Sequence, residues 1–104
     1  MTESAAGASG PGTVVLELGA GVGALVLYAP PDLDGREIEI SRDSSGARRT
    51  HSRVRPRHMP GGTRYAAVYP DLAAGTYTVW ADEARAAGRV VIAGGRITNW
   101  SWPA

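Results

Sequence analysis

Apolar and polar residues alternate with a period of two along most of this chain. The clearest example is Arg36–Ser41, in which Ile38 and Ile40 fall on one side and Glu37 and Glu39 on the other. Such alternation is typical of β-strands that bury one face, because successive side chains of a strand point to opposite sides of its sheet. The pattern therefore predicts extended chain rather than helices.

Strands of this kind recur at short intervals, and turns rich in glycine or proline separate nearly all of them. The predicted strands are Thr13–Leu18, Ala24–Tyr28, Arg36–Ser41, Arg48–Arg55, Tyr65–Tyr69, Thr76–Ala81, Arg89–Ala93 and Arg96–Trp102. Many short strands with such punctuation are typical of two sheets packed face to face. We therefore predict an all-β fold, a seven- to eight-stranded antiparallel β-sandwich.

Two turns carry specific signals. Between the strands at 65–69 and 76–81, Pro70-Asp71 followed by Gly75 predicts a short turn that joins the two strands. Gly94-Gly95 separates two runs with β-branched residues and predicts a two-residue hairpin between the last two strands. A hairpin of this kind pairs consecutive strands within one sheet.

A chain of 104 residues is large enough for one domain with a modest core. Residues 1–12 are small, polar and glycine-rich, so we expect a flexible N-terminal tail followed by one sandwich domain over residues 13–104. The absence of cysteine excludes disulfides and thiolate metal sites. The sequence shows neither a long apolar segment nor a secretory signal pattern, so we expect a cytoplasmic protein without a membrane span.

Positive charge is concentrated in one part of the sequence, although the net charge is only +1. From Arg42 to Arg64 the chain has seven arginines against a single acid, Asp43. In the strand predicted at 48–55, alternation places four basic side chains on one face, and a fifth follows shortly after. These five residues are Arg49, His51, Arg53, Arg55 and Arg57. Such a face is suited to an anionic ligand or an acidic protein partner.

Part of this charge is expected to be neutralised within the protein. If Arg36–Ser41 pairs with the arginine strand, Glu39 would lie near Arg49 and Glu37 near His51. This pairing leaves three arginines for a ligand: Arg53, Arg55 and Arg57. Nucleic acid is a less suitable partner, because the segment has no interleaved aromatic residues on which bases could stack.

A glycine-rich string near the start of the chain suggests a different function. Val15–Gly23 resembles motif I of class I S-adenosylmethionine-dependent methyltransferases, in which a strand, a glycine turn and a helix hold the cofactor. The resemblance implies that Glu37 or Glu39 would bind the ribose hydroxyls. However, Pro30-Pro31 would stop the helix after little more than one turn, and no crossover helices follow. A methyltransferase fragment is therefore an alternative function, and we expect no cofactor.

The tryptophans provide a second alternative. Trp100 and Trp102 share one face of the last strand, and Trp80 lies near the end of another strand. Exposed rings would stack on carbohydrate or on a protein partner, whereas rings turned inward would close the core. Metal binding is not expected at His51 and His58, because the neighbouring arginines repel a cation.

One segment carries a recognisable family pattern. Leu72–Val79 reads Leu-Ala-Ala-Gly-Thr-Tyr-Thr-Val and resembles the L-x-x-G-x-Y-x-V signature of transthyretin-like, carboxypeptidase-regulatory-like and collagen-adhesin B-type sandwiches. The resemblance implies that Leu72 anchors the loop in the core, Gly75 makes the turn and Tyr77 packs beneath the next corner. The chain also resembles small proteins of high-GC bacteria. Sandwiches of these families serve mostly as scaffolds or binding modules, so the resemblance implies a fold more than an activity.

No nucleophile–base pair, carboxylate dyad or metal triad is recognisable in the sequence. We therefore expect a non-enzymatic binding or accessory module that engages a protein or an anionic ligand through the arginine strand. The sequence leaves open whether the module is a monomer or a homo-oligomer.

Overall fold

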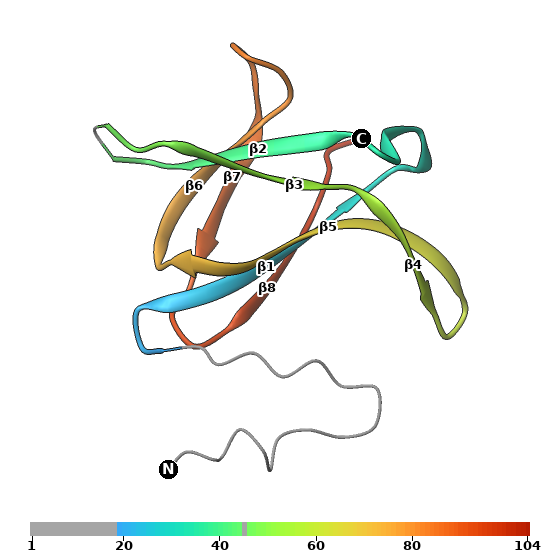
Figure 1. Ribbon diagram of the computed structural model, residues 1–104, viewed down its shortest axis with the longest axis horizontal. Coiled ribbons are helices and arrows are strands. Elements are labelled where there is room, and N and C mark those ends of the chain that lie inside the picture. The colour runs from blue at the N-terminus through green and yellow to red at the C-terminus, as the bar shows by residue number, and fades with distance from the viewer. Residues whose placement is uncertain (1–18, 45) are drawn as a thin grey trace.

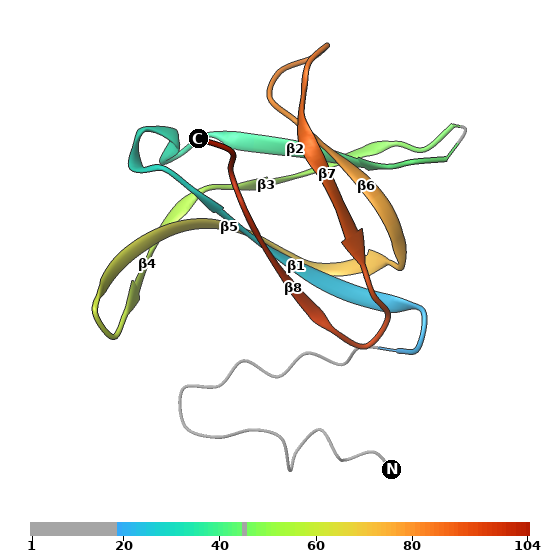
Figure 2. The same ribbon diagram turned by 180° about the vertical axis from the view of Figure 1, so that it is seen from behind.

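The computed structural model describes residues 19–44 and 46–104, which form an eight-stranded all-β sandwich (Figure 1; Figure 2). The strands are β1 (Val22–Ala29), β2 (Glu37–Arg42), β3 (Arg49–Arg53), β4 (Arg55–Met59), β5 (Gly62–Ala73), β6 (Gly75–Trp80), β7 (Ala86–Ile92) and β8 (Ile97–Ser101). A short 3-10 helix, η1 (Pro31–Leu33), follows β1. No helix in these two ranges has the length and apolarity needed to cross a bilayer. The predicted tail at 1–12 and the predicted strand Thr13–Leu18 lie outside the described residues.

The strands form two four-stranded sheets that pack face to face. Sheet 1 has the order β4-β5-β1-β8, and sheet 2 has the order β3-β2-β6-β7. Neighbouring strands run antiparallel except β1 and β8, which pair in parallel. The prediction of a β-sandwich is confirmed. Strictly antiparallel pairing is not, because β8 lies beside β1 instead of beside β7.

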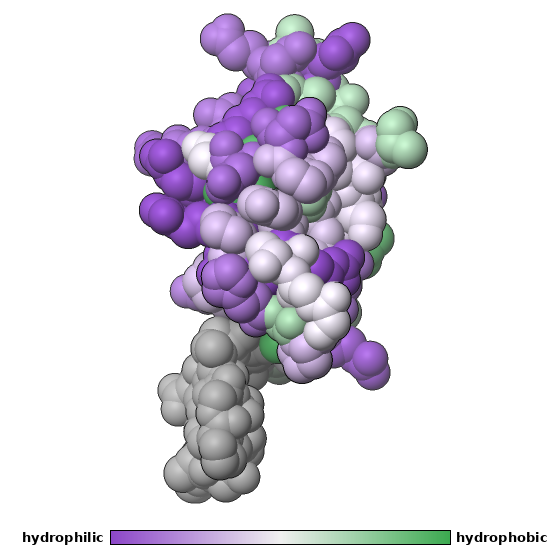
Figure 3. Space-filling model, turned by 90° about the vertical axis from the view of Figure 1, so that its right-hand side faces the viewer, coloured by the Kyte–Doolittle hydropathy of each residue, from purple (hydrophilic) through white to green (hydrophobic). Residues whose placement is uncertain are grey.

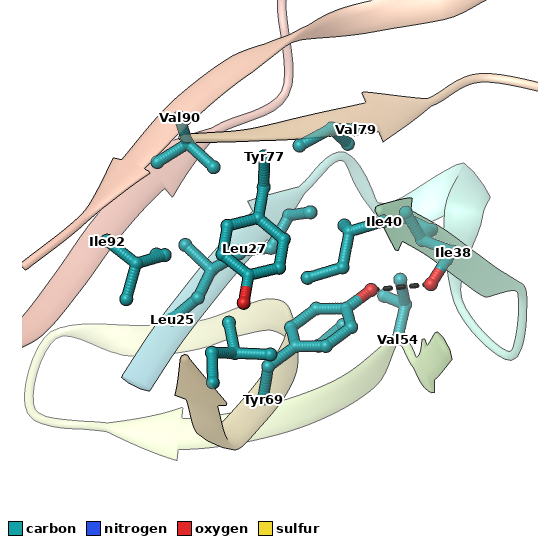
Figure 4. Close-up of a cluster of buried hydrophobic side chains, with 12 residues drawn as sticks. Leu25, Leu27, Ile38, Ile40, Val54, Tyr69, Tyr77, Val79, Val90 and Ile92 are labelled. Carbon is teal, nitrogen blue, oxygen red and sulfur yellow. Dashed lines mark hydrogen bonds between the residues drawn. The ribbon is translucent and has the colours of Figure 1, made fainter. Parts of the chain in front are cut away.

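Apolar side chains from the inward positions of both sheets fill the space between them. The buried cluster includes Leu25, Leu27, Ile38, Ile40, Val79, Val90 and Ile92 (Figure 4). Tyr69 of β5 crosses this core, and its hydroxyl donates a hydrogen bond to the carbonyl of Ile38 in β2. Burial raises the pKa of Tyr69 well above its ordinary value. The bond therefore ties sheet 1 to sheet 2 through a neutral hydroxyl.

A corner, not a hairpin turn, joins β5 to β6. Pro70-Asp71 continues β5, and the chain changes sheet at Gly75, whose φ of 149° favours glycine. Proline is accommodated at this point because β4 pairs only with residues 62–66, which leaves one side of β5 without a paired strand there among the described residues. Beneath the corner Leu72 is buried, and the Tyr77 hydroxyl donates to the carbonyl of Ala73 at 2.7 Å. This contact is a tyrosine corner of the kind found in β-sandwiches.

Three other connections also carry the chain from one sheet to the other: the segment with η1 between β1 and β2, the one at Val54 and the one at Gly94-Gly95. The strand predicted at 48–55 ends at Arg53, because Val54, its only apolar residue, is fully buried and the chain continues as β4 in sheet 1. Gly94-Gly95 leads from β7 in sheet 2 to β8 in sheet 1, so the predicted hairpin is wrong. At Gly94 a Cβ atom would lie 1.8 Å from the carbonyl oxygen of Ala20, so the turn can pack there only as glycine.

Candidate anion-binding site

The basic residues of β3 lie beside glutamates of β2. Arg49 Nη1 lies 2.9 Å from Glu39 Oε1, and His51 Nδ1 lies 3.3 Å from Glu37 Oε1, the two contacts expected from the sequence. Arg53, which was expected to be free, also binds Glu37, with Nη2 3.0 Å from Oε2. The outer face of β3 therefore carries paired charges and does not offer a set of unneutralised arginines.

Trp80 is also engaged on this outer face of sheet 2. The guanidinium of Arg49 lies 3.8 Å from the centre of its ring, a cation–π contact. The indole nitrogen of Trp80 donates to Ser41 Oγ at 2.9 Å, and Arg49 Nη2 donates to the carbonyl of Glu83 at 2.7 Å. One face of the Trp80 ring is therefore covered by a side chain of the protein itself.

Trp100 and Trp102 occupy a different part of the molecule. Both pack against the core, and their ring centroids are 6.3 Å apart at an interplanar angle of 84°. A Cβ atom on Gly88 would lie 2.7 Å from the Trp100 ring, so this ring crosses from β8 to the backbone of β7. Trp100 and Trp102 therefore do not share one surface with Trp80, and the three rings do not form the row that a common stacking platform would need.

Arg55 and Arg57 leave the β3 face because the crossing at Val54 places them in sheet 1. There β4 pairs with β5, so that Arg55 lies opposite Ala66 and Arg57 directly opposite Arg64. Residues directly opposite each other in an antiparallel pair project to the same side of the sheet. These three arginines, Arg55, Arg57 and Arg64, therefore form one cluster on the outer face of sheet 1, which we call the arginine cluster.

Two members of the arginine cluster are held against the sheet. The guanidinium of Arg64 lies 3.7 Å from the centre of the Tyr28 ring. Tyr28 faces outward, because the adjacent Leu27 points into the core. Arg57 Nη2 donates a long hydrogen bond of 3.5 Å to the carbonyl of Ala66, and its Nε is buried without a partner among the described residues. Both side chains therefore have restricted orientations.

The arginine cluster has no ion-pair partner within the described part of the chain. Among residues 19–44 and 46–104, no carboxylate oxygen lies within 4.0 Å of a nitrogen of Arg55, Arg57 or Arg64, whereas ion pairs involve five other basic residues. The side of the molecule seen in Figure 3 is largely hydrophilic, with only small apolar areas. The arginine cluster can thus supply several N–H donors and positive charge to an anion.

Alternation along the sequence does not point to Arg64 and Tyr28 as site residues. Arg64 could be identified from the turn at Pro60-Gly61-Gly62. If Met59 is placed opposite Gly62 across this turn, position 57 pairs with position 64. This pairing is not apparent when residues 48–55 are taken as one continuous strand, because residues 55–59 are then not recognised as a separate strand. Tyr28 then follows from the pairing of β1 with β5, in which it lies opposite Ala66.

The other candidate sites of the sequence take on structural roles. After Gly19–Gly21 the chain enters β1 rather than a helix, so the strand–turn–helix geometry of motif I is not formed there. His58 Nδ1 lies 3.0 Å from Thr63 Oγ1. In the part of the chain that the structure describes, no group of three or more potential ligands could hold a metal ion.

Comparisons of the chain with protein-family models, with curated proteins and with solved structures found no match. Fold and site therefore define the class of protein: an eight-stranded, mostly antiparallel β-sandwich. It carries an arginine cluster on the outer face of one sheet.

Proposed function

We propose that this chain is a non-enzymatic binding module whose arginine cluster binds an anionic group, a carboxylate or a phosphate, on a free ligand or a partner protein. The observation that carries the proposal is that Arg57 and Arg64 lie directly opposite each other, and that no carboxylate of residues 19–44 or 46–104 forms an ion pair with either of them. Compared with the sequence-based hypothesis, this site keeps Arg55 and Arg57, gains Arg64 and leaves out the paired β3 residues.

Charge repulsion favours occupation of such a site. Like charges directly opposite in a sheet destabilise it by roughly 0.2–1 kcal/mol. An anion between Arg57 and Arg64 would replace this repulsion with charge-assisted hydrogen bonds, and the planar guanidinium matches carboxylate and phosphate oxygens in bidentate geometry.

The restricted side chains also favour binding. Ordering a long side chain on binding costs about 0.5–1.5 kcal/mol, and part of this cost is already met when a side chain is held in place in the free protein. Stacking on Tyr28 orients Arg64, and the contact with the Ala66 carbonyl orients Arg57. The site is therefore partly preorganised.

The signature segment supports a binding role as well. In our proposal the chain is a sandwich of the transthyretin-like or carboxypeptidase-regulatory-like type. The support is the arrangement of Leu72, Gly75 and Tyr77 at the corner between β5 and β6. Domains of that type commonly act as accessory or binding modules, which agrees with a site made of donors alone.

Thermal unfolding in phosphate and in chloride at equal ionic strength tests the proposal. A ligand at ten times its Kd stabilises the folded state by about 1.4 kcal/mol, which raises the unfolding midpoint. The double variant Arg57→Gln/Arg64→Gln should lose this phosphate effect. The matched control Arg53→Gln/Arg89→Gln changes the net charge equally but removes arginines that are paired with Glu37 and Asp43, and it should keep the effect. Equal phosphate effects in both double variants would contradict the proposal.

A further inference from the structure

A hollow of about 260 Å³ opens beside the arginine cluster. It lies where β1 and β8 end, and its lining includes Tyr28, Pro30, Arg64, Ser101, Trp102 and Pro103. The same Arg64 whose guanidinium stacks on Tyr28 therefore borders this hollow. An anion bound to Arg64 would therefore lie next to the hollow.

The hollow follows from the parallel pairing of β1 with β8. Parallel strands end at the same edge of a sheet, and here the last backbone contact runs from Trp102 N–H to the Tyr28 carbonyl at 2.8 Å. Prolines come next on both strands, Pro30 after β1 and Pro103 after Trp102. Proline has no N–H donor and cannot continue the ladder, so the two chains separate there.

Four of the eight residues that line the hollow carry rings. Tyr28 and Trp102 contribute aromatic side chains, and Pro30 and Pro103 contribute saturated rings. Such surfaces favour flat apolar groups. Sites for drug-sized ligands usually measure about 300–1,000 Å³, so a hollow of about 260 Å³ is suited to a single ring.

We propose that the ligand is an aromatic acid, in which the carboxylate or phosphate binds the arginine cluster and the attached ring enters this hollow. The inference rests on the proposed function, because it takes anion binding at Arg57 and Arg64 as given. It names the class of ligand: a small molecule with one flat ring joined to the anion. The positive charge of the arginine cluster favours an anionic group, and the rings that line the hollow favour an aromatic group attached to that anion.

Calorimetric titration of the purified chain with four probes tests the inference: benzoate, acetate, phenyl phosphate and inorganic phosphate, at equal ionic strength. Burial of about 50 Å² of ring surface corresponds to roughly a tenfold gain in affinity. Benzoate should therefore bind about tenfold more tightly than acetate, and phenyl phosphate about tenfold more tightly than phosphate.

The variant Ser101→Tyr tests where the ring binds, because Ser101 is exposed and lines the hollow, so a larger side chain there would fill part of it. Ser101→Tyr should keep its affinity for acetate and phosphate and lose the preference for the ring-bearing probes. Ser101→Ala is the matched control and should keep that preference.

The outcomes separate the two proposals. Equal affinities of the wild-type chain for ring-bearing and ring-free anions would overturn the aromatic-acid inference and leave anion binding in place, whether or not Ser101→Tyr folds. A ring preference that survives in folded Ser101→Tyr would also overturn it, because the ring would then bind elsewhere. Binding of none of the four probes would overturn the proposed function and this inference with it.

Discussion

Replacing Arg57 with glutamine is predicted to stabilise the free protein while weakening its binding of anions. Arg57 lies directly opposite Arg64, and no described carboxylate is close enough to either side chain to form an ion pair. The buried Nε of Arg57 also lacks a hydrogen-bond partner among the described residues. Glutamine removes the positive charge but keeps the Cβ and Cγ methylene groups of the side chain.

The size of the gain can be estimated from these contacts. Relief of a directly opposed like-charge pair is worth about 0.2–1 kcal/mol. The hydrogen bond given up among the described residues is the 3.5 Å contact with the Ala66 carbonyl, which is at the long end of hydrogen-bond distances. For a domain of this size, a gain of about 0.2–1 kcal/mol raises the unfolding midpoint by about 1–8 °C.

Urea denaturation at low and high salt measures this effect. The gain should be largest at about 0.01 M sodium chloride and should shrink at about 1 M, where the Debye length falls from about 30 Å to about 3 Å. Arg53→Gln is the control: it breaks the 3.0 Å contact with Glu37, so it should leave stability unchanged or lower it by up to about 1 kcal/mol. If Arg57→Gln is less stable than the wild type at low salt, or if its gain is the same at both salt concentrations, the charge argument is refuted.

Three further substitutions probe the scaffold and its pH dependence. Tyr77→Phe removes the hydroxyl that donates at 2.7 Å across the corner and should lower the free energy of unfolding by about 1 kcal/mol in urea titrations; an unchanged value would contradict a stabilising role for this bond. Gly88→Val places a Cβ atom 2.7 Å from the Trp100 ring and should cost about 1–3 kcal/mol by the same assay, whereas a neutral result would show that the ring moves freely. The hydrogen bond from Thr78 lowers the pKa of Asp43 below 3.8 in the folded state, so its contribution is present above about pH 4 and lost as the pH falls through the folded-state pKa. Asp43→Asn should therefore lose less stability than the wild type between neutral pH and about pH 3, and equal losses would count against this role of Asp43.

Local alternation was sufficient to predict much of the fold. The strand predicted at 36–41 is β2 at 37–42, and the strand predicted at 76–81 is β6 at 75–80. Because Ile38 and Ile40 alternate with glutamates, both the core face and the contacts of Glu37 and Glu39 with β3 could be expected. These features depend on residues close in sequence or on one pairing across a short turn.

Features that depend on which sheet a strand joins could not be predicted in this way. Period-two alternation is the same in both sheets, so it does not mark the crossings at Val54, Gly75 and Gly94-Gly95. Nor does it indicate that β8 pairs in parallel with β1, because these strands are far apart in the chain. The only local signal was that Val54 is the one apolar residue in a polar run, and its complete burial explains why the strand ends there.

The crossing at Val54 also explains why one basic run has two different environments. Residues before it pair with β2, whose outward positions are Glu37 and Glu39, so Arg49 and Arg53 find carboxylates. Residues after it pair with β5, whose facing positions at 64 and 66 are arginine and alanine. The change of sheet therefore separates arginines that contribute to the scaffold from arginines that remain available to a ligand. For this reason a binding site is better inferred from the pairing partners of each strand than from the density of charge along the sequence.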